Sequence, residues 1–331
     1  MDRDQPDDDT MKAAIALACR APSVHNTQPW RWLLGDRTVH LYADVDRHVP
    51  ATDPTGTDLL LGCGAALHHL RIALAALGWA AIVHRLPDPA RPDHLAAVEF
   101  VRREPTASDV ALAAAIPRRR TDRRRYSSWT VPPAVLAQLG DRAADEGAIA
   151  HAVVEPEERF ELAAALGFAA ALQDADPAYR WEVRTWSGRH ADLDGVPAAN
   201  APVGVPVHGD LRLREFPGGE LRDVPAGDWE EDGASLLVLG TSSTDALSTL
   251  RAGEAMSAVL LEATAAGLAT CPLSQALEVD ETRDRVRRRV LHDTLCPQIV
   301  VRVGWPAFNA DPLPPTPRRP PSEVTGGLEP A

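Results

Sequence analysis

Hydrophobic residues along the chain fall into long helical runs and short strand-like runs, organised in two successive stretches. In the first stretch, apolar residues recur at helical spacing, or alternate with polar residues between turn-forming ones. The predicted elements there are helices at 10–20 and 58–78, with strands within 30–44 and at 81–86 and 95–101. In the second stretch, helices are predicted at 111–117, 131–147, 157–173 and 248–270, and strands at 148–155, 234–241 and 296–306.

The two long apolar helices contain a weak internal repeat. Residues 64–78 (GAALHHLRIALAALG) align without gaps with residues 253–267 (GEAMSAVLLEATAAG), and the glycines at both ends match. Alanine-rich helices resemble each other by chance, but similar elements flank both segments, so the pattern favours a duplication. We therefore expect an α+β protein of two halves, 1–107 and 108–331, with small mixed or antiparallel sheets around long central helices.

Two segments lack regular periodicity. Residues 183–226 are rich in glycine and proline, and loops of this length are usually functional covers or disordered. Aromatic residues within the segment, such as Trp186 and Phe216, favour a cover that packs on the protein. The tail at 312–324 is so rich in proline that we expect an extended segment without regular structure.

Composition narrows the range of partners and compartments. The net charge of the 331 residues is −13, which argues against nucleic acids and anionic membranes, because basic patches bind both. The four cysteines fit no zinc spacing, which favours free thiols in a reducing compartment. The acidic N-terminus does not resemble a signal peptide, and we find no apolar run of the roughly 18 residues that a membrane span needs. A soluble, cytoplasmic protein is expected.

The string APSVHNTQPW at 21–30 is the most unusual local feature. Pro22 fixes one φ angle, and Pro29 favours an extended Gln28, so a rigid turn is expected before the strand. The turn gathers side-chain amides and hydroxyls beside Trp30, which suits a planar heterocycle with polar edges. A turn that only joins a helix to a strand explains the same residues equally well.

This string resembles the Ala-Pro-Ser-x-x-Asn-x-Gln-Pro-Trp signature of the nitroreductase superfamily of flavin enzymes. Three more segments are similar to motifs of that family: RRRTDRRRY at 118–126, AAGLATCPLSQAL at 265–277 and PPTPRRP at 314–320. In ordinary members the arginine motif precedes the Ala-Pro-Ser turn, whereas here it follows about one hundred residues later. The chain thus resembles the Acg-type nitroreductases of actinobacteria, in which two nitroreductase-like halves are fused into a pseudo-dimer.

The resemblance implies one FMN per chain, held between the halves of a pseudo-dimer that can act as a monomer. The half at 1–107 supplies the APSVHNTQPW turn, and the half at 108–331 supplies the other three motifs and a lid at about 183–226. A second flavin site lacks its motifs, because only acidic sequence precedes Ala21 and no Ala-Pro-Ser turn precedes the strand at 148–155.

By the same resemblance, the flavin N5 atom carries the chemistry and no side chain is catalytic. Arg119 with Arg318 or Arg319 suits the phosphate, Thr121 the ribityl chain or phosphate, and Arg123 the N1/O2 edge. The cofactor-binding residues that it implies are Pro22, Ser23, Asn26, Gln28, Arg119, Thr121, Arg123, Pro272, Leu273, Ser274, Arg318 and Arg319. Without the motif partners, the arginine run is an ordinary solvated face. For Cys271 and the pair His68–His69, packing is the simpler interpretation.

Two functions remain open. In the first, NAD(P)H reduces the flavin by hydride transfer to N5, and the electrons pass to a nitroaromatic or quinone-type acceptor. In the second, the protein stores or sequesters FMN beneath the lid and has little reductase activity. Both functions use the same pocket, so the motifs do not separate them.

Overall fold

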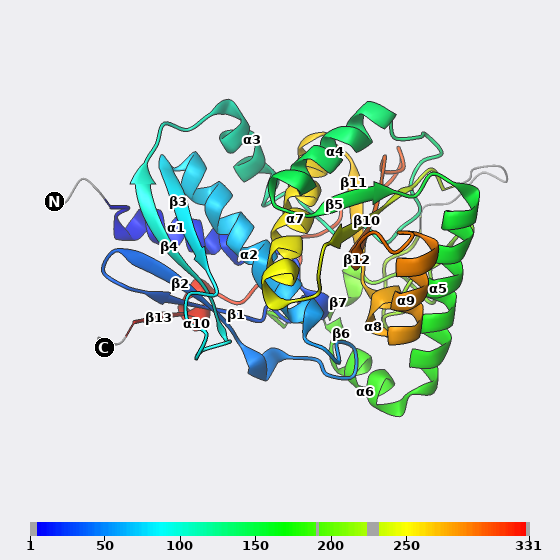
Figure 1. Ribbon diagram of the computed structural model, residues 1–331. Coiled ribbons are helices and arrows are strands. Elements are labelled where there is room, and N and C mark those ends of the chain that lie inside the picture. Colours follow the sequence, from blue (N-terminus) through cyan, green and yellow to red (C-terminus); the bar gives the residue numbers. More distant parts are fainter. Residues whose placement is uncertain (1–4, 190–191, 224–231, 329–331) are drawn as a thin grey trace.

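The computed structural model describes residues 5–189, 192–223 and 232–328. Two sheets flank a central pair of long helices, α2 (Thr57–Ala76) and α7 (Ala246–Ala265), which pack against each other (Figure 1). The first sheet has the order β13-β1-β2-β4-β3, and the second has the order β11-β12-β10-β5. The core is continuous from one sheet through the helix pair to the other.

The elements of the first sheet and its helix are α1 (Asp8–Ala18), β1 (Trp30–Leu34), β2 (Thr38–Ala43), β3 (Trp79–Arg85), β4 (His94–Arg102) and β13 (Thr325–Gly327). The elements of the second are α4 (Pro133–Asp145), β5 (Ile149–Ala152), β10 (Ser235–Thr241), β11 (Ala269–Leu273) and β12 (Cys296–Gly304). The remaining elements are α3 (Ala107–Ala115), α5 (Pro156–Ala175), α6 (Pro177–Thr185), α8 (Gln275–Glu278), α9 (Asp280–Arg289), α10 (Pro321–Val324) and the short strands β6 (Ser187–Arg189), β7 (Val196–Pro197), β8 (Val207–His208) and β9 (Leu211–Arg212).

The two sheets share one connectivity. The chain runs α1-β1-β2-α2-β3-β4 in the first and α4-β5-β10-α7-β11-β12 in the second, if α5, α6 and the segment up to β10, and α8 and α9 between β11 and β12, are set aside. The corresponding strand orders are β1-β2-β4-β3 and β5-β10-β12-β11, with every pair antiparallel. Only β13, which pairs in parallel with β1, has no counterpart in the second sheet.

The helix pair crosses at the glycines that the repeat aligns. A Cβ atom added to Gly64 would lie 2.1 Å from the carbonyl oxygen of Leu250, and one added to Gly253 would lie 2.3 Å from that of Leu61. The contacts are reciprocal, because Leu61 and Leu250 are themselves aligned positions. Glycine is required at both places, since any side chain would push the helices apart.

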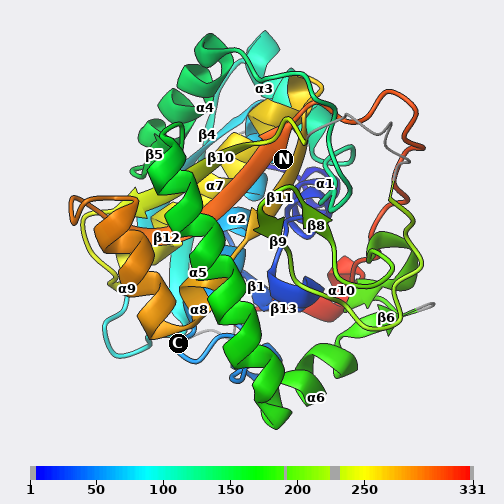
Figure 2. The same ribbon diagram turned by 90° about the vertical axis from the view of Figure 1, so that its right-hand side faces the viewer.

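The second sheet is covered on both faces. Leu237 and Leu239 belong to the central core shared with α7, whereas Leu236 and Val238 belong to a cluster that includes Leu162 of α5. This is the alternation that a strand buried on both sides produces. Figure 2 shows α5 lying across the outer face of this sheet, beside α8 and α9.

Several expectations need correction. The helix expected at 248–270 ends at Ala265, because Gly267 takes a φ of 82°, and β11 then occupies residues expected to be helical or a turn. The tail at 312–324, expected to lack regular structure, contains α10, and the residues directly after it form β13 on the first sheet. The segment from residue 108 onwards therefore does not form a separate unit, because its last strand pairs with β1 of the first sheet.

The segment 183–226 packs on the protein as a cover. It begins in the last turns of α6, and Val183, Val196, Ala201 and Phe216 form a small apolar cluster with Tyr179. Its short strands pair locally as β6–β7 and β8–β9. Residues 190–191 and 224–226 of the expected lid lie outside the described residues.

Helix α2 is long and apolar enough to cross a membrane by length and composition, contrary to the expectation that no run of that size exists. However, 78 % of its apolar window is buried inside the protein, as in the core helix of a globular fold.

Candidate functional site

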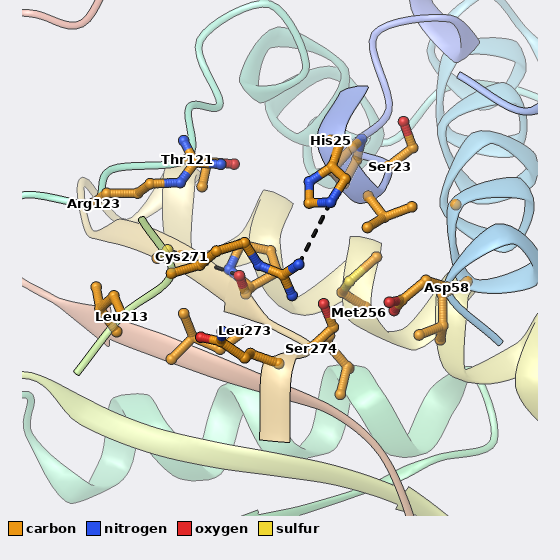
Figure 3. Close-up of a pocket in the computed structure, with 18 of the residues that line it drawn as sticks. Ser23, His25, Asp58, Thr121, Arg123, Leu213, Met256, Cys271, Leu273 and Ser274 are labelled. Atoms are coloured by element: carbon orange, nitrogen blue, oxygen red, sulfur yellow. Dashed lines mark hydrogen bonds between the residues drawn. The ribbon is translucent and has the colours of Figure 1, made fainter. Parts of the chain in front are cut away.

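A pocket is lined by residues within 22–62 and within 121–299, and Figure 3 shows its lining. The turn before β1, the first turns of α2, the segment after α3, the end of β11 and the cover all contribute to it. Seven of the twelve cofactor-binding residues expected from the sequence line it: Pro22, Ser23, Thr121, Arg123, Pro272, Leu273 and Ser274. The other five, Asn26, Gln28, Arg119, Arg318 and Arg319, lie outside this lining.

The turn at 21–29 has a strained backbone. His25, Asn26 and Gln28 have φ angles of 46°, 57° and 53°, in the left-handed region that residues other than glycine rarely adopt. Gln28 is therefore not extended as expected, and its backbone N–H donates to Ser23 Oγ at 2.9 Å. Such strain persists only where the surroundings impose it, and it concentrates at functional sites.

The side chains of Asn26 and Gln28 join the turn to the cover and to the tail. Asn26 Nδ2 donates to the carbonyl oxygens of Gly195 at 3.0 Å and Pro317 at 3.3 Å. Gln28 Nε2 donates to Leu193 O at 2.8 Å, and Gln28 Oε1 accepts from the backbone N–H of Arg319 at 2.8 Å. Asn26 Oδ1 is buried without a partner, so one acceptor of this pair remains available.

Arginines gather beside the pocket without acidic partners. Arg119, only 5 % exposed, and Arg318 both donate to the carbonyl oxygen of Arg20, at 3.5 and 3.3 Å. The Nε atoms of all three and Arg119 Nη1 are buried and unpartnered. No carboxylate among the described residues forms an ion pair with any of them. We call Arg20, Arg119, Arg120 and Arg318 the arginine cluster.

The electrostatics of the arginine cluster are unfavourable in the protein alone. Burial, together with the charges of Arg120 and Arg20, lowers the pKa of Arg119 to about 10. Burial and Arg119 lower the pKa of Arg318 well below its ordinary value. Arg319 differs, because its guanidinium lies 3.6 Å from both Asp44 and Glu323. Of the two tail arginines, Arg318 is therefore the one left for an anionic ligand.

Arg123 lies under the cover. Its Nη1 donates to Asn200 O at 3.1 Å, and its guanidinium stands 4.6 Å from the centre of the Phe216 ring. His208 Nε2 lies 2.8 Å from Arg123 O and holds the backbone in place. Burial lowers the pKa of Arg123, and Arg214 adds a repulsive charge. Thr121 is fixed nearby, because it forms an isolated β-bridge with Thr270 of β11.

The opposite side of the pocket is acidic. Glu278 is buried and forms an ion pair with Arg214, accepts from Ser274 Oγ at 2.7 Å and accepts from Gln173 Nε2 at 2.6 Å. A dashed line in Figure 3 marks the 3.4 Å contact between Arg214 Nη1 and His25 Nε2. Burial, Arg214 and Arg123 lower the pKa of His25 well below its ordinary value, so its imidazole is neutral. Asp58 also lines this side.

Sequence analysis did not identify Arg20, Asp58 or Arg214 as site residues. Arg20 directly precedes the turn, so its position next to a motif could have drawn attention to it. Asp58 looked like an ordinary acid at the start of a helix, and Arg214 lies in a segment without periodicity. Cys271 lines the pocket, but burial raises the pKa of its thiol, which therefore stays protonated.

The arrangement has three chemical parts: a cationic cluster without counter-ions, a slot bordered by the strained turn and β11, and an acidic wall next to the cover. It can hold a ligand with an anionic end and a flat body, and it can place hydrogen-bond donors and an acid beside that body. Leu213, Arg214 and Phe216 of the cover form part of the pocket lining.

The relatives found by comparison with known proteins agree with the resemblance of the sequence motifs to nitroreductases. No family model matches the chain. In Mycobacterium tuberculosis H37Rv, "Putative NAD(P)H nitroreductase Rv3131" is 47% identical over 96% of this chain and 92% of its own length. In the same organism, "Putative NAD(P)H nitroreductase acg" is 39% identical over 96% and 95%, and "Uncharacterized protein Rv3127" is 40% identical over 94% and 91%.

Two solved structures show a weaker likeness. A nitroreductase with bound FMN from Bacteroides fragilis has a TM-score of 0.37 and 16% identity, covering 60% of this chain and 90% of its own. One from Desulfitobacterium hafniense has a TM-score of 0.40 and 14% identity, covering 66% and 98%. A likeness this low says nothing about the cofactor of this chain.

Proposed function

The chain belongs to the family of NAD(P)H nitroreductase-like proteins that includes Rv3131 and acg, and we propose that it is an FMN-dependent oxidoreductase. NAD(P)H supplies a hydride, and the electrons pass to a small nitroaromatic or quinone-type acceptor. The observation that carries the proposal is the arginine cluster, because buried guanidinium groups without carboxylates need an anion to be stable there.

The residues fit FMN. Arg119 and Arg318 would bind the phosphate with Arg20 beside them, and Thr121 would bind the phosphate or ribityl chain. Arg123 would face the N1/O2 edge, and Pro22 and Ser23 would cover the ring from the opposite half. Asn26 would contribute through its free Oδ1, while Gln28 would hold the turn in shape. The backbone from Pro272 to Ser274 would lie near N5. Arg319 would not bind the flavin, because it is paired with Asp44 and Glu323.

We also propose that the chain is a fused pseudo-dimer with one flavin. The shared connectivity of the two sheets and the reciprocal glycine contacts of α2 and α7 support a duplication. The connection from α1 to β1 runs through residues 19–29, whereas that from α4 to β5 is only residues 146–148. The second half therefore has no equivalent of the turn that would cover another flavin. A cytoplasmic location stays a prediction.

FMN sequestration is the second candidate, and the anchoring of the cover favours it. Gly195 and Leu193 are bonded to the turn, and Asp194 pairs with Arg47, so the cover is fastened to the turn and to the segment between β2 and α2. If these contacts do not open, large acceptors stay out.

One experiment separates the two. The purified protein is examined for flavin absorbance and then mixed with NADPH or NADH without oxygen. Rapid bleaching supports the oxidoreductase. A yellow protein inert to both nucleotides supports sequestration, and a colourless protein that does not take up added FMN contradicts both.

A further inference from the structure

Asp58 stands out among the groups that line the pocket because no cation among the described residues forms an ion pair with its carboxyl group. It lies in the first turn of α2, is 7 % exposed, and its Oδ2 is buried without a hydrogen bond. Figure 3 shows its carboxyl oxygens on the cavity side, toward Met256 and Ser274. A buried polar atom without a partner is rare in proteins and asks for an explanation.

The surrounding groups do not neutralise a charge on Asp58. Arg214, the cation of this wall, is already paired with Glu278. Asp53, in the loop before α2, adds a second carboxyl group; it accepts from the backbone N–H of Leu59 at 2.9 Å, and His48 Nε2 lies 3.8 Å away. Asp58 therefore faces two carboxyl groups and one guanidinium that is committed elsewhere.

These surroundings favour the protonated form. The N-terminus of a helix stabilises a carboxylate by about 0.3–2 kcal/mol. Burial of a carboxyl group raises its pKa by up to about 3–5 pH units, and each unit is about 1.4 kcal/mol. Burial and nearby carboxylates therefore raise the pKa of Asp58 by more than the helix N-terminus lowers it. Accordingly, burial, Asp53 and Glu278 raise the pKa of Asp58 well above its ordinary value, against the smaller effects of Arg214 and Ser274.

We propose that Asp58 is the proton donor of the acceptor site, with its O–H directed at an exocyclic oxygen of a planar acceptor, such as a quinone carbonyl. The proposal rests on the proposed function, which supplies the reducing equivalents. Arg214 and His25 border the same space and add hydrogen-bonding groups. The acceptor class is therefore a small ring compound that carries oxygens able to accept a proton.

The proton and electron balance of the step is simple. A quinone takes up a hydride equivalent, originally from NAD(P)H, at one oxygen. The Asp58 O–H bond breaks, and its proton forms a new O–H bond on the second oxygen. The product is the hydroquinone, Asp58 is left as a carboxylate, and it recovers a proton from water before the next turnover.

The protonation state of Asp58 is tested without any flavin. An acid whose pKa is raised by folding stabilises the folded state at pH values below its unfolded pKa, and that stabilisation is lost as the pH rises through the folded pKa. Asp58→Asn mimics the protonated acid, so the difference in unfolding free energy between variant and wild type should shift in favour of the variant as the pH rises. Asp141→Asn, at an exposed acid of α4, is the control. A difference that does not change with pH overturns the protonated state.

The donor role is tested by single-turnover reoxidation. FMN-loaded protein, reduced with dithionite, is mixed with 1,4-benzoquinone or with ferricyanide, which takes electrons without protons. Asp58→Asn should slow the quinone reaction on the order of 10²-fold and leave the ferricyanide reaction unchanged. Equal slowing of both, or of neither, contradicts the proposal. Dithionite replaces NAD(P)H as the reductant in this experiment. If NADH and NADPH do not reduce the wild-type protein, NAD(P)H is refuted as its electron donor, and the role of Asp58 is still tested by the quinone and ferricyanide reactions.

Discussion

Two regions of the molecule contain buried ionisable groups, and they differ in whether those groups are paired with an opposite charge. In the pocket region, Asp58 and the arginine cluster have no counter-charge. In what we call the ion-pair region, Glu254 of α7 is fully buried and is bonded by Arg85 at 2.7 and 2.9 Å and by Arg71 at 2.9 Å. The ion pairs of the second region stabilise the fold. The pocket region lacks such counter-charges, and a bound ligand could supply them.

The repeat makes this comparison position by position. Gly62 aligns with Arg251, and Asp58 with Leu247, a partly exposed apolar residue. A Cβ atom on Gly62 would lie 3.1 Å from Ser23 Cβ, so glycine lets the turn approach α2. At the aligned position, the Arg251 side chain instead fills the space beside Gly147 of the short α4–β5 connection. The glycine at this position thus accompanies an open pocket beside α2. The arginine at the aligned position fills the corresponding space beside α7.

The largest effect is expected in the ion-pair region. Glu254→Gln removes the fully buried carboxylate that pairs with Arg85 and Arg71, which should lower the unfolding free energy by about 3–5 kcal/mol. FMN affinity of the folded protein should not change. Glu99→Gln, which breaks the exposed His84–Glu99 pair, should cost no more than about 1 kcal/mol in the same denaturant titration. Loss of flavin at unchanged stability would mean that the two regions are not separate.

The same region should make the fold sensitive to acid. His68 is buried between the helices, with Nδ1 2.8 Å from Ser257 Oγ, and burial lowers its pKa to about 4 from an ordinary 6.5. The unfolded chain takes up a proton before the folded one, so stability falls as the pH drops from about 6.5 to 4, by on the order of 3 kcal/mol. His68→Gln should flatten this slope in pH-dependent unfolding, whereas His84→Gln, at an exposed site, should not.

A substitution in the arginine cluster should lower the affinity for FMN but raise the stability of the flavin-free protein. Arg119→Ala removes the charge-assisted contact that we propose for the flavin phosphate, worth about 1.5–3 kcal/mol, and should weaken FMN binding roughly 10- to 100-fold. The same change relieves repulsion among buried cations, so the flavin-free protein should become more stable, not less. Fluorescence titration with FMN and thermal unfolding measure the two effects.

The control must be an arginine without a structural role. Arg283, on α9, is unsuitable, because its Nε donates to Leu277 O at 2.7 Å. Arg288, with a side chain 55% exposed, is the matched choice. Equal flavin retention in Arg119→Ala and Arg288→Ala would count against the phosphate assignment.

Sequence patterns located most of the long helices and strands because their cores have strong periodicity or capping glycines. They failed where a tertiary contact decides the outcome. The strand β11 is imposed by pairing with β12, and β13 forms only because β1 offers a free edge. Of the site, the motif residues were found by their resemblance to a family. Asp58 and Arg214 were not, because burial and the approach of distant charged groups are properties of the folded chain that no local pattern records.

The smallest effect concerns the glycine that admits the turn. Gly→Ala inside a helix normally gains about 0.8–1 kcal/mol, and Gly140→Ala in α4 should do so, because nothing lies within 4 Å of the new methyl group. In Gly62→Ala the methyl group meets Ser23, which should offset that gain and displace the strained turn. FMN binding should weaken by about 0.5–1 kcal/mol, roughly two- to fivefold in Kd. A Gly62→Ala protein as stabilised as Gly140→Ala and with unchanged flavin affinity would show that the close approach of the turn to α2 does not shape the site.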